Sequence, residues 1–192
     1  MAVYRIRTRR WTRAEYDRLV ASGTFHPGER LELLDGQLVV REPQGSRHAV
    51  AIELALSALQ GAFGSAWRVR VQLPVALEVD SEPEPDLSVV AGDPRASSRA
   101  HPPDPVLIVE VADASLAFDR EHKAGLYARA RVADYWIVNL VDQTLEVYRE
   151  PALAPLTPFG WRYVRRQVLG LGASVFPLAA PSARIGVADL LP

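Results

Sequence analysis

The chain has 192 residues, 48% of them hydrophobic and 23% charged, with a formal net charge of −1, which suits one globular domain with a sizeable core. The near-neutral charge argues against a protein that coats nucleic acid by bulk electrostatics, and the absence of cysteine excludes disulfides and cysteine-ligated zinc. No apolar run approaches the ~18 residues of a membrane span, and the charged first residues contain no signal-peptide core, so we expect a cytoplasmic protein without a membrane partner.

The N-terminal segment predicts a helix over residues 13–22. Thr12 is a suitable N-cap for this helix, and Glu15 completes a capping box. Six arginines lie within residues 5–18. They can form a basic arm for a phosphate backbone or the solvated face of the helix and its lead-in, and we favour the solvated face.

A hairpin and a second helix are expected next. Residues 29–42 contain two apolar-rich arms around Asp35-Gly36, which is a strong signal for a two-residue turn. Ser46 can cap a helix over residues 47–62, because the apolar side chains there recur with helical spacing.

The remainder of the chain alternates strand and helix signals. Residues 92–105 are polar and proline-rich, which predicts a surface loop, and residues 119–131 predict a helix. Strands are expected at 67–73, 75–79, from Asp86 onward, 105–112, 133–140, 144–150 and 161–168. This order of elements predicts an α/β fold with a mixed central sheet.

Two carboxylates stand at apolar strands of this sheet. Glu110 interrupts the run PVLIVEVA, and Asp86 precedes the run LSVV. A buried charge is costly unless it is paired or bound to a metal. Asp86 and Glu110 are therefore candidates to hold one Mg²⁺ or Mn²⁺ ion, which can polarise a phosphoryl oxygen and activate a water.

The single lysine of the chain lies close by. Lys123 is the one lysine among 22 basic residues, and Asp119, Lys123 and Tyr127 share one face of the predicted helix. A compact ammonium can orient a water or stabilise a pentavalent phosphate where a planar guanidinium cannot. The alternative is an exposed lysine that pairs with Asp119 by chance, and we favour the functional interpretation.

The segments EPD (84–86), IVEV (108–111) and the long run from 119 to 138, in this order, resemble the Uma-two family of endonucleases. That family is similar to the PD-(D/E)xK restriction-endonuclease superfamily. The resemblance implies a restriction-endonuclease-like fold, a mixed sheet flanked by helices. We expect one domain over residues 1–192, with its core at 11–149 and a C-terminal strand and extension at 150–192.

The resemblance also implies a metal-dependent phosphodiesterase site. Asp86 matches the aspartate of the PD motif, and Glu110 matches the acidic residue of the next strand. Ala112 stands where the superfamily usually has its lysine, which indicates that Lys123 takes this role from the following helix. Glu32 matches an acidic position on the early hairpin that would complete the metal site. Its alternative is an exposed residue of an alternating strand.

Three further side chains are possible accessories. His48 can donate to a phosphate or hold a water, although a surface or capping histidine is the commoner case. Asp119 can orient Lys123, or it can simply be an aspartate that the helix dipole favours at an N-terminus. Tyr127 can contact phosphate or pack in the core. Glu78 and Glu84 could reach a metal, but we interpret both as solvated.

We therefore expect an endonuclease that uses Mg²⁺ or Mn²⁺ to hydrolyse phosphodiester bonds of nucleic acid, most simply DNA. Two alternatives stay open. One is a catalytically silent module of the same fold that binds nucleic acid or protein, and the other is a metal-dependent hydrolase of small phosphoesters. Tyr135, Trp136 and Trp161 can serve a homodimer interface or fill the core.

Overall fold

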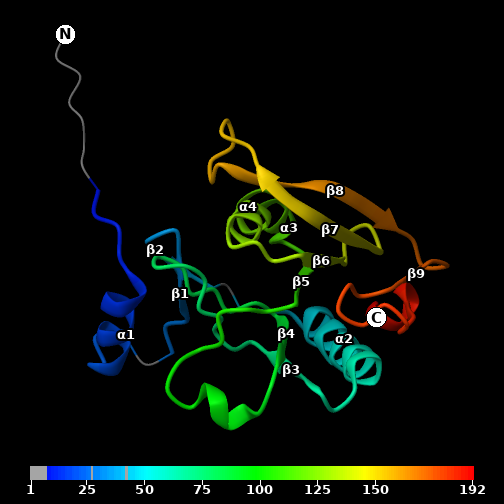
Figure 1. Cartoon of the computed structure of the whole chain (residues 1–192), viewed down its shortest axis with the longest axis horizontal. Coiled ribbons are helices and arrows are strands. Elements are labelled where there is room, and N and C mark those ends of the chain that lie inside the picture. The colour runs from blue at the N-terminus through cyan, green and yellow to red at the C-terminus, as the bar shows by residue number, and fades with distance from the viewer. Residues whose placement is uncertain (1–7, 27, 42) are drawn as a thin grey trace.

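The predicted mixed central sheet is present and has six strands. The computed structural model describes residues 8–26, 28–41 and 43–192. Strands β5 and β6 are parallel, and all other neighbours in the sheet are antiparallel. The strand order is β3 (Trp67–Val71), β4 (Leu87–Ala91), β5 (Leu107–Ala112), β6 (Asp134–Asn139), β7 (Thr144–Leu153) and β8 (Trp161–Leu169) (Figure 1).

Helices cover both faces of this sheet. Helix α2 (Ser46–Phe63) packs on one face, and the segments α3 (Leu116–Phe118), η2 (Asp119–Lys123) and α4 (Ala124–Arg129) lie over the other. Successive strand residues point to opposite faces. Accordingly Val109 and Val111 join the core under α2, whereas Ile108 and Ala112 join the core under α4. This alternation directs Glu110 toward the face that carries Lys123.

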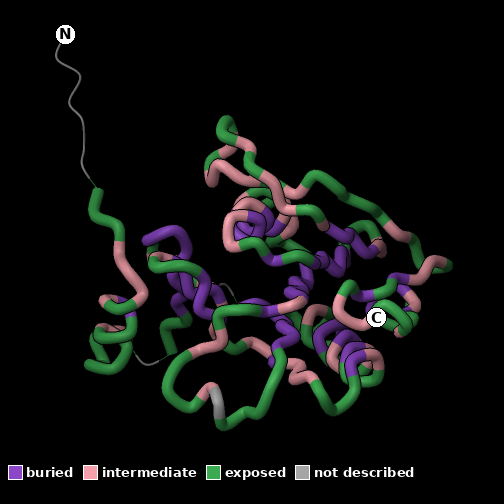
Figure 2. The backbone as a smooth tube through the Cα atoms, viewed as in Figure 1, coloured by how far each residue is buried: buried purple, intermediate pink, exposed green. Residues whose placement is uncertain are grey.

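The N-terminal segment forms helix α1 (Arg13–Ala21) and the hairpin of β1 (Leu31–Leu34) and β2 (Gln37–Val40). The capping box between Thr12 and Glu15 is confirmed. The tight turn at Asp35-Gly36 is also confirmed. Asp35 has a φ angle of 48° and Gly36 one of 73°, and the twist of a two-residue hairpin turn requires such positive angles. All four residues of β1 are buried (Figure 2). The arginines at positions 5 and 7 lie outside the described residues.

The prediction of a strand at residues 75–79 is wrong. These residues form an irregular turn, because Gln72 and Glu78 adopt positive φ angles of 49° and 52° and three prolines interrupt pairing nearby. The amide of Val75 donates instead to the Pro83 carbonyl at 3.0 Å, and that of Ala76 donates to the Pro102 carbonyl at 3.0 Å.

Two helices also differ from expectation. Helix α2 takes Gly45 as its N-cap, with no side-chain capping bond, and Ser46 is already helical. The helix expected at residues 119–131 is divided, since η2 is one π-helical turn between α3 and α4. It ends early, because Arg131 adopts a left-handed conformation with φ of 60°. Single π-turns of this kind inside a helix occur frequently at functional sites.

The C-terminal segment completes the core beside α2. It contains β9 (Ser174–Val175), β10 (Ile185–Gly186) and η3 (Val187–Leu190), and side chains from all three are buried against the sheet and α2. A short 3-10 turn, η1 (Pro94–Ser97), lies in the predicted surface loop. Across the described residues no helix has the length and apolarity needed to traverse a bilayer.

Candidate active site

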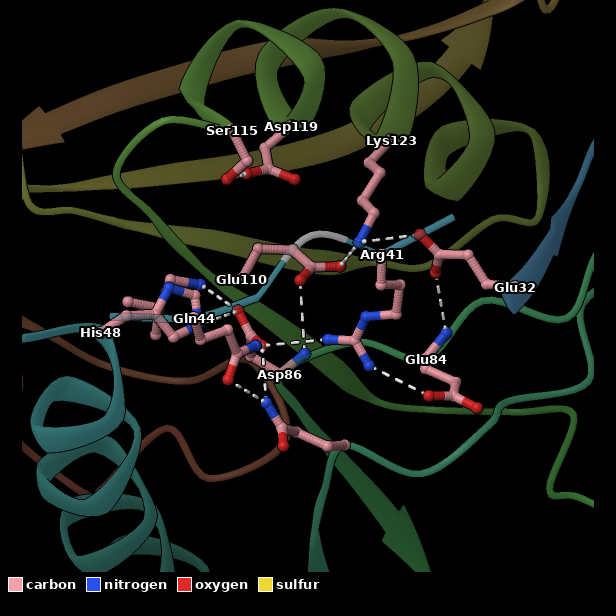
Figure 3. Close-up of polar contacts among 12 residues, drawn as sticks. Glu32, Arg41, Gln44, His48, Glu84, Asp86, Glu110, Ser115, Asp119 and Lys123 are labelled. Atoms are coloured by element: carbon pink, nitrogen blue, oxygen red, sulfur yellow. Dashed lines mark hydrogen bonds and ion pairs between the residues drawn. The ribbon is translucent and has the colours of Figure 1, made fainter. Parts of the chain in front are cut away.

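The predicted site residues meet in one pocket of about 440 Å³. Its walls come from β1, β2, the start of α2, the start of β4, the end of β5, α3 and η2. The pocket brings together the side chains named from the sequence, with Tyr127 just beneath it: Glu32, His48, Asp86, Glu110, Asp119 and Lys123 (Figure 3).

Lys123 occupies the centre of the charge arrangement. Its Nζ lies 2.9 Å from Glu110 Oε1 and 3.7 Å from Glu32 Oε1, and the residue is 6% exposed. Burial opposes the charge on this ammonium, but Glu110 and Glu32 overcome that effect and raise the pKa of Lys123. This arrangement favours the charged ammonium, which donates to Glu110.

Both carboxylate oxygens of Glu110 accept hydrogen bonds. Oε1 accepts from Lys123 and, at 2.6 Å, from the Tyr127 hydroxyl, while Oε2 accepts from the Asp86 amide at 3.3 Å. Burial raises the pKa of Glu110 above its ordinary value, and the Lys123 ammonium counteracts part of that rise. Tyr127 is both fully buried in the core and bonded to the site.

Asp86 sits where β4 begins and accepts several donors. Oδ2 accepts the amide of Val111 at 2.9 Å and lies 3.2 Å from His48 Nε2, without the alignment of a hydrogen bond. Oδ1 accepts from Gln44 at 3.1 Å and from Arg41 at 3.4 Å. Burial alone would raise the pKa of Asp86, but His48 and the Val111 amide outweigh burial and lower it.

Glu32 is 3% exposed, so the interpretation of an exposed strand residue is wrong. The Glu84 amide donates to its Oε2 at 3.1 Å, which fixes the carboxylate beside Lys123. The expectation that Glu84 is solvated is also wrong. Its side chain is half-buried and accepts from Arg41 at 3.0 Å. Glu78 is exposed, as expected, and pairs with Arg129 at 2.7 Å.

The structure places the accessory candidates differently from their commoner interpretations. His48 is no ordinary surface residue, because its side chain is 13% exposed and faces Asp86. Asp119 does not sit at an exposed helix start. It is 2% exposed and accepts the Ser115 hydroxyl at 2.6 Å, and burial raises its pKa.

Sequence reasoning missed Arg41. Its side chain is 9% exposed and reaches from the end of β2 to both Glu84 and Asp86. Nothing in the sequence separates it from the other arginines. The proposed interface residues Tyr135 and Trp136 are fully buried in the core, so neither can serve a dimer interface. Of the three aromatic candidates, only Trp161 keeps some exposure.

The donor set suits a hard divalent cation. Of the described residues that line the pocket, four are buried carboxylates, against two permanent cations, Arg41 and Lys123. Mg²⁺ prefers oxygen ligands and needs only one or two carboxylates besides water. Over the described part of the chain no three His, Asp or Glu side chains are grouped as a ready metal site. Asp86 and Glu110, which are linked at 3.3 Å through the Asp86 amide, are the pair that fits.

Comparison with known proteins places the fold and the family. The family model Uma2, described as "Putative restriction endonuclease", matches residues 13–179. A solved structure described as "a putative nuclease belonging to DUF820 from Anabaena variabilis" is similar with a TM-score of 0.67 and 16% identity, covering 93% of this chain and 96% of that chain. Comparison with curated proteins gave no match. The match over most of the chain shows that this protein belongs to the Uma2 family.

Proposed function

We propose that this protein is a metal-dependent nuclease that hydrolyses phosphodiester bonds, with DNA as its substrate and Mg²⁺ or Mn²⁺ as its cofactor. The observation that carries the proposal is the buried ion cluster in which Lys123 faces Glu110 and Glu32 beside Asp86. Membership of a family described as "Putative restriction endonuclease" supports this reaction class.

Asp86 and Glu110 would hold the cation. When bound, a divalent ion there supplies Lewis-acid polarisation of a phosphoryl oxygen and lowers the pKa of a coordinated water. Lys123 Nζ stands between Glu110 and Glu32 (Figure 3). We therefore assign Glu32 first to the positioning of Lys123. Glu32 would bind the metal only if it gave up its ion pair with Lys123.

Lys123 would donate to the water or to the phosphate oxygens that gain charge in the transition state. Because this ammonium is already charged, buried and held by two carboxylates, little free energy is needed to reorganise it during the reaction. Arg41 contacts Asp86 Oδ1 at 3.4 Å and His48 Nε2 lies 3.2 Å from Asp86 Oδ2, and both would contact a phosphate oxygen that enters the pocket.

Cleavage assays test this proposal directly. Purified protein is incubated with plasmid and with single-stranded DNA in Mg²⁺, in Mn²⁺ and in chelator, beside Lys123→Ala, Asp86→Ala and the exposed control Arg18→Ala. We expect metal-dependent cleavage by wild type and by the control, and a loss of at least about 100-fold in both site variants.

Equal cleavage by Lys123→Ala and wild type would refute the assignment of the lysine. No cleavage by wild type with any cation would refute the nuclease and favour a catalytically silent binding module. Cleavage of a small phosphodiester with both DNA forms left intact would identify a different phosphoesterase.

A further inference from the structure

Apolar side chains line part of the mouth of the pocket, beside the exposed polar residues Gln44, Asp113 and Ser115, whereas its floor is charged. Phe118 and Val40 both line the pocket and are 36% and 57% exposed. Val39, Pro43 and Ala114 add further apolar surface to the same walls. A metal and a phosphate make no use of such side chains, so this part of the pocket fits a different portion of a substrate.

Phe118 is held in a defined orientation. Its ring stacks on His122 with a centroid distance of 4.8 Å and an interplanar angle of 11°, and His122 packs edge-on against Phe159 at 4.8 Å. Burial lowers the pKa of His122, which favours the uncharged form of the supporting ring. One face of Phe118 is therefore occupied by His122, and the exposed remainder of the ring lies at the pocket.

The pocket offers little that would track a phosphate backbone. Of the described residues that line it, Arg41 and Lys123 are the permanent cations, and both side chains are paired with carboxylates. Proteins that grip duplex DNA by its phosphates use many free lysines and arginines. A planar apolar group is thus the better match for the pocket mouth than a second run of phosphates.

We propose that Phe118 stacks on a nucleobase next to the scissile phosphate, so that the substrate is single-stranded or carries an unpaired base at the cleavage point. This inference rests on the proposed function. Both faces of a base inside a duplex are covered by its neighbours, and only an unpaired or extruded base can offer a free face to an aromatic ring. Val40, which lines the same pocket, would add apolar contact to that base.

Binding separates this inference from catalysis. Affinity is measured by fluorescence anisotropy with a labelled single-stranded oligonucleotide of about 12 nucleotides. All proteins carry Asp86→Asn, so that the oligonucleotide is not cleaved, and three of them add Phe118→Ala, Phe118→Leu or Phe118→Tyr. The control adds Phe176→Ala, since Phe176 is 47% exposed and does not line the pocket. We expect binding roughly tenfold weaker with alanine and with leucine, and unchanged with tyrosine and in the control.

Cleavage supplies the second readout. In an otherwise wild-type chain, Phe118→Ala should raise KM for the single strand about tenfold with kcat nearly unchanged, and the perfect duplex should be cleaved more slowly than the single strand. Unchanged affinity and KM in Phe118→Ala would overturn the stacking inference while leaving the nuclease intact. Leucine binding as well as phenylalanine would also overturn it, because an aliphatic side chain has no π-face. Weaker binding in the alanine variant of a protein that cleaves nothing would uphold the stacking and refute the nuclease.

Discussion

Replacement of Lys123 by methionine tests whether this residue holds the buried carboxylates together. Methionine keeps much of the volume of the side chain and removes its ammonium. The substitution therefore abolishes two ion pairs, one of 2.9 Å to Glu110 and one of 3.7 Å to Glu32. At an effective dielectric constant near 20, each is worth roughly 4–6 kcal/mol of attraction, part of which offsets the desolvation of the ammonium. We expect a net loss of about 3–5 kcal/mol in the free energy of unfolding, as when one partner of a buried pair is removed.

The assay is urea denaturation of both proteins at pH 8 in chelator, so that no bound cation compensates for the missing ammonium. Arg18→Met in α1 removes an exposed cation and should change the stability by less than about 0.5 kcal/mol. Lys123→Arg keeps the charge and should retain more stability than Lys123→Met while losing cleavage, because its planar group cannot reproduce both ion pairs. A loss below about 1 kcal/mol in Lys123→Met would refute the role of Lys123 as counter-ion of the site.

Three further outcomes are expected. Glu146 is fully buried and accepts from Arg120, Arg166, Tyr148 and Asn139; these donors outweigh burial and lower its pKa to about 2. Glu146→Gln should therefore cost roughly 3 kcal/mol at pH 7, and in a denaturation series the difference should shrink as pH falls below 4.5 toward 2. Burial raises the pKa of Glu82 to about 7, so the native protein binds an extra proton there and loses stability as pH rises from 4.5 through 7. In the same denaturation series Glu82→Gln should be as stable as wild type near pH 4 and more stable by up to roughly 3 kcal/mol at pH 8. Equal stabilities at pH 8 would contradict this. Mn²⁺ at about 100 times its Kd should stabilise wild type by about 2.7 kcal/mol, reversed by chelator and absent in Asp86→Asn, as measured by thermal denaturation.

The order of most elements and the identity of the charged cluster follow from the amino-acid sequence alone. Local signals suffice for a capping box at Thr12 and for a tight turn at Asp35-Gly36, since both depend on residues a few positions apart. The alternation of an almost wholly apolar strand likewise assigns Glu110 to one face of the sheet, and a buried carboxylate there demands a partner. Asp86 is indicated by its place before an apolar strand, Lys123 is indicated by its being the single lysine on a helix face with Asp119 and Tyr127, and the family resemblance implies both.

The arrangement of this cluster depends on the tertiary fold. The burial of Glu32 depends on the turn at residues 80–86 packing against β1, and the pairing of Arg41 with Asp86 joins segments 45 residues apart. The π-turn that carries Lys123 is not encoded in an i, i+4 pattern. These features arise from contacts between distant parts of the chain, whose desolvation and charge partners no local sequence pattern specifies.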